Sequence, residues 1–383
     1  MEPTQTLPPV SPLPPAAAPE PQQPSPPEPS PQSEGREPWH KRKRVRVLIV
    51  VSTLLIAAGA VTYWAVVFAS YKPVDMTVKK PEAKAPPKKY YSPLTGREMP
   101  DEAMTKRTVT AIMVENSPDA RPQSGLKEAG VVYEAIAEGG ITRFAALYQA
   151  ARPGLIGPVR SLRPYFVEWI TPYNPAIAHV GGSARALEMV RGEGYRDIDQ
   201  FFNADAYYRS TDRYAPHNVY TTFDRLDALN QSKSYTESIF EGWPRKADAP
   251  AAEPNASSIN VTISGPLYNP TYTYKKETNS YDRQQGGEAH IDRESGQISP
   301  NVVIVMKIPM TAGFEDGYRE QMETSGSGAA YIFQDGTVTE GEWQKADVKA
   351  PLRFIDGNKQ PVKLNAGQTW LTAITTERTV SWQ

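Results

Sequence analysis

The chain has 383 residues, a formal net charge of −1 at pH 7 and no cysteine. The balanced charge gives no electrostatic basis for binding nucleic acid. The absence of cysteine excludes disulfides, thiolate nucleophiles and cysteine-bound metals. A chain of this length has room for two or three domains.

The N-terminal segment is rich in proline: residues 1–39 hold 14 of the 37 prolines. Such a segment cannot bury enough apolar surface to offset the conformational entropy of the chain. We therefore expect residues 1–46 to form a disordered tail with polyproline II character, ending in a basic cluster.

An uncharged run of 23 residues, 47–69, directly follows that basic cluster. About 20 apolar residues are enough for a helix to cross the roughly 30 Å hydrocarbon core of a bilayer. Basic residues in front of such a helix hold the N-terminus in the cytoplasm, so the sequence predicts a single-pass membrane protein with its folded part outside. A cleaved signal peptide is the alternative, but the run is longer than a typical signal core and lacks a small-x-small cleavage site.

Composition divides the rest of the chain into two domains. Residues 70–90 are rich in lysine, proline and alanine and are expected to be a linker that begins beside the membrane. A second stretch of proline and alanine, 244–258, is expected to separate an N-terminal domain, 91–243, from a C-terminal domain, 259–383. Both domains fall in the normal size range.

The N-terminal domain mixes the two kinds of secondary structure. Apolar patterns predict strands at 108–114, 131–137, 141–148 and 175–180, and helices at 164–171 and 184–191. The turn residues Glu138-Gly139-Gly140 predict a hairpin between the second and third of these strands. Strands that alternate with helices are typical of a layered α/β domain.

The C-terminal domain is predicted to be mostly β. Expected strands lie at 259–263, 271–275, 302–307, 329–333, 337–340 and 369–374. Asp335-Gly336 and Asp356-Gly357 have the composition of hairpin turns. The fold class of the whole chain is therefore α+β, with a membrane anchor in front.

Polar residues that could bind an anion are concentrated in the N-terminal domain. The candidates are Asn116, Arg121, Glu134, Glu138, Arg143, Arg160, Ser161, Arg163 and His217. A guanidinium group binds phosphate or carboxylate through two parallel hydrogen bonds. The free N–H groups of a helix N-terminus add to the positive potential that attracts an anion. The sequence thus predicts an arginine-rich anion site, with the two glutamates orienting the arginines.

A purely structural alternative stays open for part of this set. Glu134 and Glu138 are expected on one face of their strand, with Arg143 close enough to reach Glu138 across the hairpin. These residues and Arg163 could instead form a buried salt-bridge network. The turn Gly181-Gly182 between a strand and a helix is a second, weaker candidate for an anion cradle.

No cofactor or metal site is predicted. His179, His217 and His290 have no metal-ligand spacing, and we expect hydrogen-bonded structural roles for them. Ser161 and Ser183 lack the sequence context of a nucleophilic serine.

The motifs of this chain resemble those of the YerB-like family of bacterial extracytoplasmic proteins. The matching motifs are Leu94-Thr95-Gly96, Met113-Val114-Glu115-Asn116, Arg121-Pro122-Gln123-Ser124-Gly125, Val132-Tyr133-Glu134, Glu138-Gly139-Gly140-Ile141-Thr142-Arg143-Phe144, Gly157-Pro158-Val159-Arg160-Ser161-Leu162-Arg163, Ala215-Pro216-His217-Asn218, Tyr281-Asp282-Arg283 and Gln368-Thr369-Trp370. The resemblance covers essentially residues 91–376. It implies a two-domain protein of the cell envelope. The family has no established catalytic residues that could be assigned to positions in this chain. Typical members of that family carry a lipid on a cysteine, whereas this chain replaces that anchor with an apolar helix.

We expect a non-enzymatic envelope module whose partners are the cell membrane and an anionic wall precursor, a glycan or a wall-synthesis protein. Two alternatives remain. One is an enzyme acting on phosphate-linked or glycan substrates, with Glu138 or His217 as acid or base. The other is a scaffold whose proline-rich tail recruits cytoplasmic machinery.

Overall fold

The computed structural model describes residues 43–72, 88–317 and 319–383. It divides into two units, Met1–Lys84 and Ala85–Gln383, which are described separately. Most of the expected tail and of the expected linker 70–90 lies outside the described residues.

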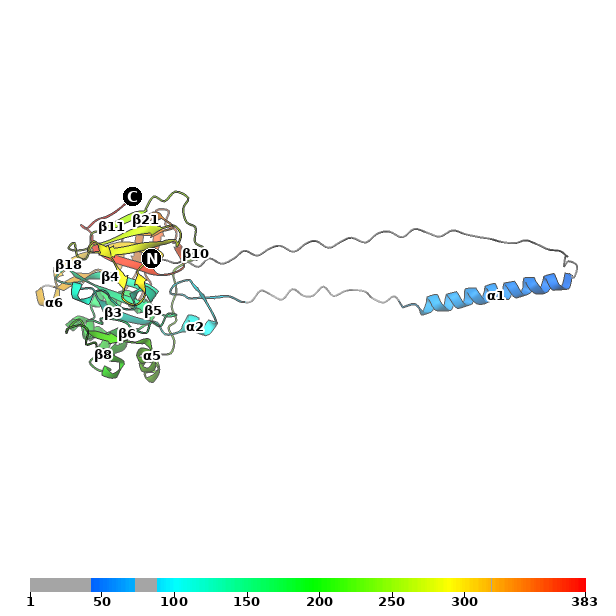
Figure 1. Ribbon diagram of the computed structural model, residues 1–383, viewed down its shortest axis with the longest axis horizontal. Helices are drawn as coiled ribbons and strands as arrows, with labels where there is room; N and C mark the ends of the chain where they lie inside the picture. Colours follow the sequence, from blue (N-terminus) through cyan, green and yellow to red (C-terminus); the bar gives the residue numbers. More distant parts are fainter. Residues whose placement is uncertain (1–42, 73–87, 318) are drawn as a thin grey trace, which may run out of the picture. The chain divides into compact units, whose positions relative to one another are not determined.

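Helix α1 (Lys43–Ser70) is the described element of the first unit (Figure 1). Its stretch Val50–Ser70 is long and apolar enough to cross a membrane, by length and composition. The Thr62 hydroxyl donates a hydrogen bond to the Ala58 carbonyl at 2.8 Å, so this polar group has a partner within the helix. Such internal pairing is what a helix in hydrocarbon requires.

The second unit is organised around one sheet of twelve strands (Figure 1). Ten of them follow the order β22 (Arg353–Asp356), β21 (Thr337–Lys345), β20 (Gly326–Gln334), β17 (Val302–Ile308), β24 (Thr369–Thr375), β4 (Val131–Glu138), β5 (Ile141–Tyr148), β3 (Thr110–Glu115), β6 (Ala176–His179) and β7 (Arg196–Asp199). Strands β18 (Met310–Gly313) and β19 (Arg319–Met322) form a hairpin that joins the sheet at β4.

A smaller sheet and four strand pairs complete the β structure. The smaller sheet has the order β14 (Glu288–Ala289), β13 (Ser280–Gln285), β12 (Pro270–Lys275), β11 (Ser258–Val261) and β25 (Val380–Trp382). The pairs are β1 (Tyr90–Tyr91) with β2 (Glu98–Met99), β8 (Tyr207–Arg209) with β9 (Val219–Thr221), β10 (Arg245–Lys246) with β23 (Leu364–Asn365), and β15 (Ile291–Asp292) with β16 (Gly296–Gln297).

Short helices lie between the strands. The α-helices of this unit are α2 (Glu102–Lys106), α3 (Pro164–Ile170), α4 (Ala184–Gly192), α5 (Phe223–Ser232) and α6 (Phe314–Gly317). Single 3₁₀ turns lie at Pro118–Ala120, Leu126–Glu128, Thr171–Tyr173 and Ala204–Ala206. The fold is therefore mixed α+β, with much sheet and few helices.

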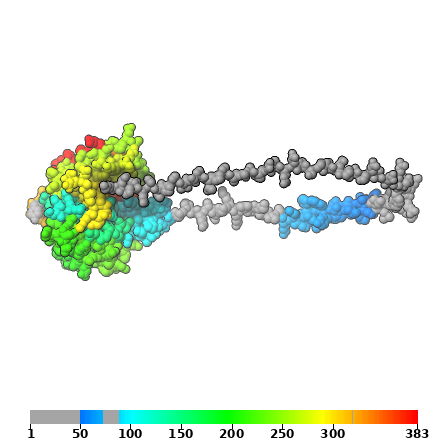
Figure 2. Space-filling view, in the orientation of Figure 1, coloured from blue at the N-terminus to red at the C-terminus, as the bar shows by residue number. Residues whose placement is uncertain are grey.

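The two halves of the unit share the main sheet. β24, from the C-terminal half, pairs in parallel with β4, from the N-terminal half, with Trp370 beside Val132. In the space-filling view, the green surface of the N-terminal half and the yellow surface of the C-terminal half meet directly (Figure 2). The hydrogen-bond ladder thus continues from one half into the other.

Both faces of the main sheet are buried. On one face of β4, Tyr133 stacks on Trp169 of α3, with ring centroids 5.8 Å apart. On the other face, Val132 lies in a second apolar cluster with Phe144 and Trp370, whose rings meet edge to face at 5.2 Å. A strand buried on both faces needs a nearly continuous apolar sequence, as β4 has.

The segment 244–258, which we expected to be an interdomain linker, is fixed to the fold. Arg245 donates hydrogen bonds to the carbonyls of Asn365 at 2.9 Å and Leu94 at 2.6 Å. Lys246 pairs with Asp335. These contacts bind the segment to both halves.

The predicted hairpin between β4 and β5 is confirmed. One expectation about it is wrong, because Glu134 and Glu138 do not share a face of β4. A bulge between Ile136 and Glu138 shifts the register, and Glu138 contacts Arg143, which lies opposite Ala135. Glu134 lies on the face of Val132, and an extra residue in a strand reverses the alternation beyond it.

Candidate functional site

Three parallel strands end at one edge of the main sheet. β3 pairs in parallel with β6, and β6 pairs in parallel with β7. Sheets of this kind bind ligands just beyond the carboxyl ends of their strands. A cleft of about 500 Å³ opens there, which we call the arginine cleft. It is lined by Arg160, Ser161, Val180, Gly181, Gly182, Leu187, Arg191, Phe201, Phe202, Arg209, Pro216 and Val219.

A glycine turn forms one wall of the arginine cleft. Gly181 follows β6 with φ +60, a left-handed conformation that glycine adopts without steric cost. Ser183 then caps α4, because its side chain accepts a hydrogen bond from the Ala186 amide. Asp199, at the end of β7, accepts hydrogen bonds from the amides of Gly181 at 3.0 Å and Phe201 at 3.2 Å. This buried carboxylate therefore fixes two segments of the cleft.

His179 supports the same turn and is fully buried. One ring nitrogen, Nδ1, lies 2.8 Å from the Gly181 carbonyl, and the other, Nε2, lies 3.0 Å from the Asp197 carboxylate. Burial would raise the pKa of Asp197, but the contacts with His179 outweigh it and lower that pKa. These contacts fit the structural role that we expected for this histidine.

Arg160 lies on an extended segment that is hydrogen-bonded to β3 on one side and to the end of β6 on the other. Its amide donates to the Met113 carbonyl at 2.9 Å, and its own carbonyl accepts from Val180 at 3.1 Å. The guanidinium Nε lies 3.4 Å from Glu115 Oε1. Among the described residues Arg160 Nε has no hydrogen-bond partner, so the pairing with Glu115 is loose.

Two further arginines line the cleft and were not among the predicted site residues. Arg191, in the last turn of α4, donates to Asp199 at 2.9 Å and stacks over the Phe202 ring at 4.9 Å. Arg209, on β8, donates to the Asn218 side chain at 2.8 Å. Within the described part of the chain, Arg209 has no ion pair. The residues that line the cleft include three arginines and no acidic residue.

His217 lies beside the cleft in a small polar cluster. Its Nδ1 is 2.9 Å from Glu115 Oε1 and 3.2 Å from the Ser117 hydroxyl. Nε2 is 3.9 Å from Asp119. A serine nucleophile needs its acid and its hydroxyl on opposite ring nitrogens, whereas here both contact Nδ1. The cluster is thus a carboxylate–histidine pair and no serine triad.

The predicted contact between Arg143 and Glu138 is confirmed at 2.9 Å. Arg163, at the N-cap of α3, binds the other oxygen of the same carboxylate. Burial alone would raise the pKa of Glu138, but the two guanidinium groups outweigh it and hold that pKa at about 2. Arg143 also donates to the Ser161 carbonyl at 3.0 Å. Both arginine side chains are almost fully buried, which makes this cluster structural.

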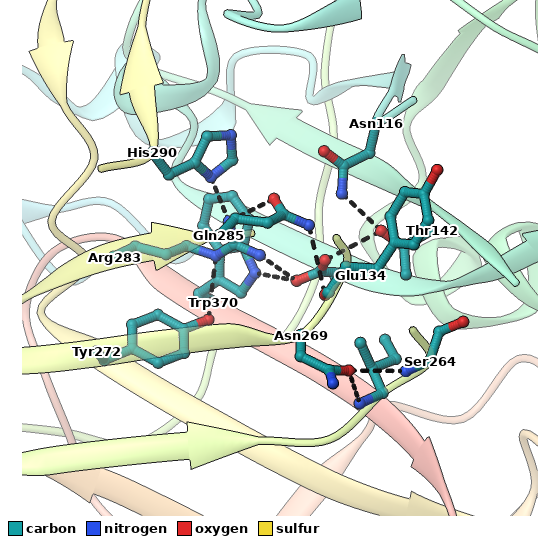
Figure 3. A network of polar contacts seen from close by, with 12 residues as sticks. Asn116, Glu134, Thr142, Ser264, Asn269, Tyr272, Arg283, Gln285, His290 and Trp370 are labelled. Atoms are coloured by element: carbon teal, nitrogen blue, oxygen red, sulfur yellow. Dashed lines mark hydrogen bonds and ion pairs between the residues drawn. The ribbon is translucent and has the colours of Figure 1, made fainter. Parts of the chain in front are cut away.

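Glu134 belongs to a different, fully buried network (Figure 3). It accepts hydrogen bonds from Arg283 at 2.8 Å, from the Trp370 indole at 3.0 Å and from Thr142 at 3.2 Å. The Arg283 guanidinium also lies over the Trp370 ring at 4.5 Å. Burial and the neighbouring Arg283 lower the pKa of His290 well below its ordinary value, so this histidine is neutral. The network joins the N-terminal half to the C-terminal half.

Arg121 and Asn116 form a third group. Arg121 donates to the Asn116 side chain at 3.2 Å and to the Leu267 carbonyl at 2.8 Å. Its guanidinium lies over the Tyr268 ring at 5.3 Å. Asn116 in turn donates to the Thr142 hydroxyl at 2.6 Å. These contacts position the loop after β3 against the C-terminal half.

The structure therefore separates the predicted site residues. Arg160 and Ser161 line the arginine cleft, with His217 beside it, and Gly181-Gly182 forms its wall. The other predicted residues form three separate groups of contacts. Glu138, Arg143 and Arg163 pair with one another, as in the structural alternative, whereas Glu134 lies in a different network with Arg283. In the described ranges, no group of three or more His, Asp or Glu side chains is arranged to hold a metal ion.

Comparison with known proteins identifies the family. Residues 94–236 match the family described as "Protein of unknown function (DUF3048) N-terminal domain", and residues 259–371 match its C-terminal domain. The "Putative lipoprotein YerB" of Bacillus subtilis (strain 168) is 32% identical over 297 residues, which cover 75% of this chain and 87% of that protein. The crystal structure of the Bacillus subtilis YerB protein has a TM-score of 0.68 and 25% identity, covering 76% of this chain and 99% of that chain.

The relative's name and the apolar helix α1 both fit attachment to a membrane. The resemblance to the YerB-like family, which the motifs predicted, is confirmed over both halves. The chain belongs to the DUF3048 family, and it carries the N-terminal and C-terminal domains of that family.

Proposed function

We propose that the protein is a membrane-tethered module that binds a phosphate-bearing component of the bacterial cell envelope in the arginine cleft. The observation that carries this proposal is the composition of the cleft. Three arginines surround a glycine turn at the carboxyl edge of parallel strands, and none of the residues lining the cleft is acidic. Guanidinium groups at such an edge bind phosphate by charge and by paired hydrogen bonds.

The partial pairing of these arginines supports binding rather than a purely structural role. Arg209 is held by a neutral amide, and Arg160 is only loosely paired with Glu115. An incoming phosphate can therefore pair with both guanidinium groups without displacing a strong ion pair. Arg143 and Arg163, by contrast, already share the Glu138 carboxylate in close ion pairs.

The tether follows from α1. We propose that this helix crosses the membrane once, with the N-terminus in the cytoplasm and the folded unit outside. Five basic residues in the six positions 41–46 support this orientation. Protease added to intact cells should digest the folded unit, and protection of that unit would contradict the orientation.

Calorimetric titration with inorganic pyrophosphate tests the binding proposal. We expect the double variant Arg160→Ala, Arg209→Ala to bind at least about tenfold more weakly, because each lost charged hydrogen bond is worth more than about 1 kcal/mol. Arg353→Ala is the matched control, since Arg353 is an exposed arginine on β22, at the other end of the main sheet. Equal affinities for the wild type and the double variant would refute the proposal.

A second candidate function is hydrolysis of a phosphate ester. The observation that favours it is the contact between His217 and Glu115 at 2.9 Å, beside a cleft that Pro216 helps to line. An imidazole that is oriented by a carboxylate is a common general acid or base. Release of phosphate from a diphosphate ester, lost in His217→Asn with unchanged binding, would support this candidate. No turnover by the wild type would exclude it for that substrate.

A further inference from the structure

We infer that the ligand of the arginine cleft is a lipid phosphate, whose apolar chain packs on Phe201 and Phe202. This inference rests on the proposed function and narrows its substrate class. The side chains are 68% and 71% exposed, although both are large and apolar. Adjacent exposed rings at the rim of a binding cleft mark a surface that a ligand covers.

The two rings stand on a backbone that is held by hydrogen bonds. They directly follow β7, where Asp199 binds the Phe201 amide at 3.2 Å. A Cβ atom added at Gly181 would lie 3.1 Å from the Phe201 ring, so this ring lies directly over the glycine turn. The Arg191 guanidinium lies over the Phe202 ring, 4.9 Å from the ring centroid. The apolar surface and the positive charge are thus in contact.

Phe202 also separates two hollows of the surface. It lines the arginine cleft and a second hollow of about 610 Å³. The second hollow has an apolar part, to which Ala204, Ala206, Ala228 and Leu229 contribute, and a polar part that includes Asp205, Asp224 and Arg225. A molecule with its phosphate among the arginines can therefore run its chain across Phe202 into this second hollow.

An amphipathic anion satisfies both parts of the surface. Inorganic phosphate would pair with the arginines and leave the two rings in water. An apolar chain would cover the rings but leave the charges without a partner. A lipid phosphate supplies both, and burial of its chain adds hydrophobic stabilisation to the charge pairing. Helix α1 is long and apolar enough to cross a membrane, and a membrane is a source of lipid phosphates.

Two probes that share a headgroup test the inference. The full chain, in nanodiscs of phosphatidylcholine, is titrated with geranyl diphosphate and with inorganic pyrophosphate, and empty nanodiscs correct for partitioning. We expect the geranyl compound to bind at least about tenfold more tightly. The double variant Phe201→Ser, Phe202→Ser should lose this difference, because both compounds then bind through the diphosphate alone.

Control variants separate the inference from the proposal on which it rests. Replacement of both phenylalanines by leucine should preserve the preference, and Ile239→Ser removes a comparably exposed apolar side chain elsewhere without effect. If the serine variant keeps the preference, or if the wild type shows none, the lipid inference is overturned while the anion site stands. If Arg160→Ala, Arg209→Ala binds pyrophosphate like the wild type, the anion site itself fails. A serine variant that instead loses affinity for a wall glycan would assign the rings to sugar stacking and overturn the inference.

Discussion

Glu138 holds two buried guanidinium groups at once, those of Arg143 and Arg163. Its folded-state pKa of about 2 lies below the ordinary value of 4.5. A carboxylate with a depressed pKa stabilises the fold fully above its unfolded pKa, and this stabilisation is lost as the pH falls toward the folded pKa. The contribution should therefore disappear between about pH 4.5 and pH 2.

Glu138→Gln tests this assignment. We expect the variant to lower the free energy of unfolding by about 2 kcal/mol at pH 7, because two buried guanidinium groups lose their shared anion. The difference from the wild type should shrink as the pH falls from 4.5 toward 2. Urea unfolding at several pH values measures it, and a difference that is constant across this range would contradict the account.

The sequence could predict part of this residue-scale picture. The contact of Arg143 with Glu138 follows from the geometry of a hairpin across Gly139-Gly140. The bulge in β4 has no comparable sequence signal, so Glu134 and Glu138 were wrongly expected on one face. Arg209 could not be recognised either, because its place in the cleft depends on the packing of the β8–β9 hairpin.

At the scale of elements, the contact between β4 and β13 is a buried polar link between the halves. Glu134 of β4 and Arg283 of β13 are both fully buried and pair at 2.8 Å. Removing one member of such a pair leaves an uncompensated charge in the interior, which typically costs about 3–5 kcal/mol. We therefore expect Glu134→Gln and Arg283→Met each to lower the free energy of unfolding by that amount.

The double variant should cost less than the sum of the two single variants, because neither charge is then left alone. Chemical unfolding of all four proteins gives the coupling energy. Additive losses would show that the two side chains act independently. That result would remove this pair as the link between β4 and β13.

Elements with local signals were predicted well, and those that depend on distant pairing were not. The strands β17, β20 and β24 were expected from their apolar or alternating sequences and are present. β13 was missed, although Arg283 had been noticed, because its polar side chains hide the strand pattern. The parallel pairing of β24 with β4 joins segments more than 200 residues apart and leaves no local trace in the sequence.

At the scale of the whole molecule, the shared sheet predicts that residues 88–383 unfold together. β24 lies between β17 and β4, so neither half completes the sheet by itself. A protein consisting of 88–243 would expose the edge of β4 and leave Glu134 without Arg283 and Trp370. We expect this fragment to remain unfolded.

Calorimetry distinguishes unfolding of residues 88–383 as one unit from separate unfolding of the two halves. A single transition of 88–383, with equal calorimetric and van't Hoff enthalpies, is the expected result. Two separate transitions would contradict it, and they would show that the two family domains fold independently. A folded fragment 88–243 would lead to the same conclusion.

The central claim is that an anion binds at the carboxyl edge of β3, β6 and β7. The most direct measurement is NMR of the isotope-labelled unit 85–383 during titration with inorganic pyrophosphate. We predict that the amide signals of Gly181, Gly182 and Arg209 shift in a saturable way, while signals around Glu138 stay in place. Saturation with no shift at the glycine turn, or shifts confined to Glu138 and its arginines, would contradict the claim.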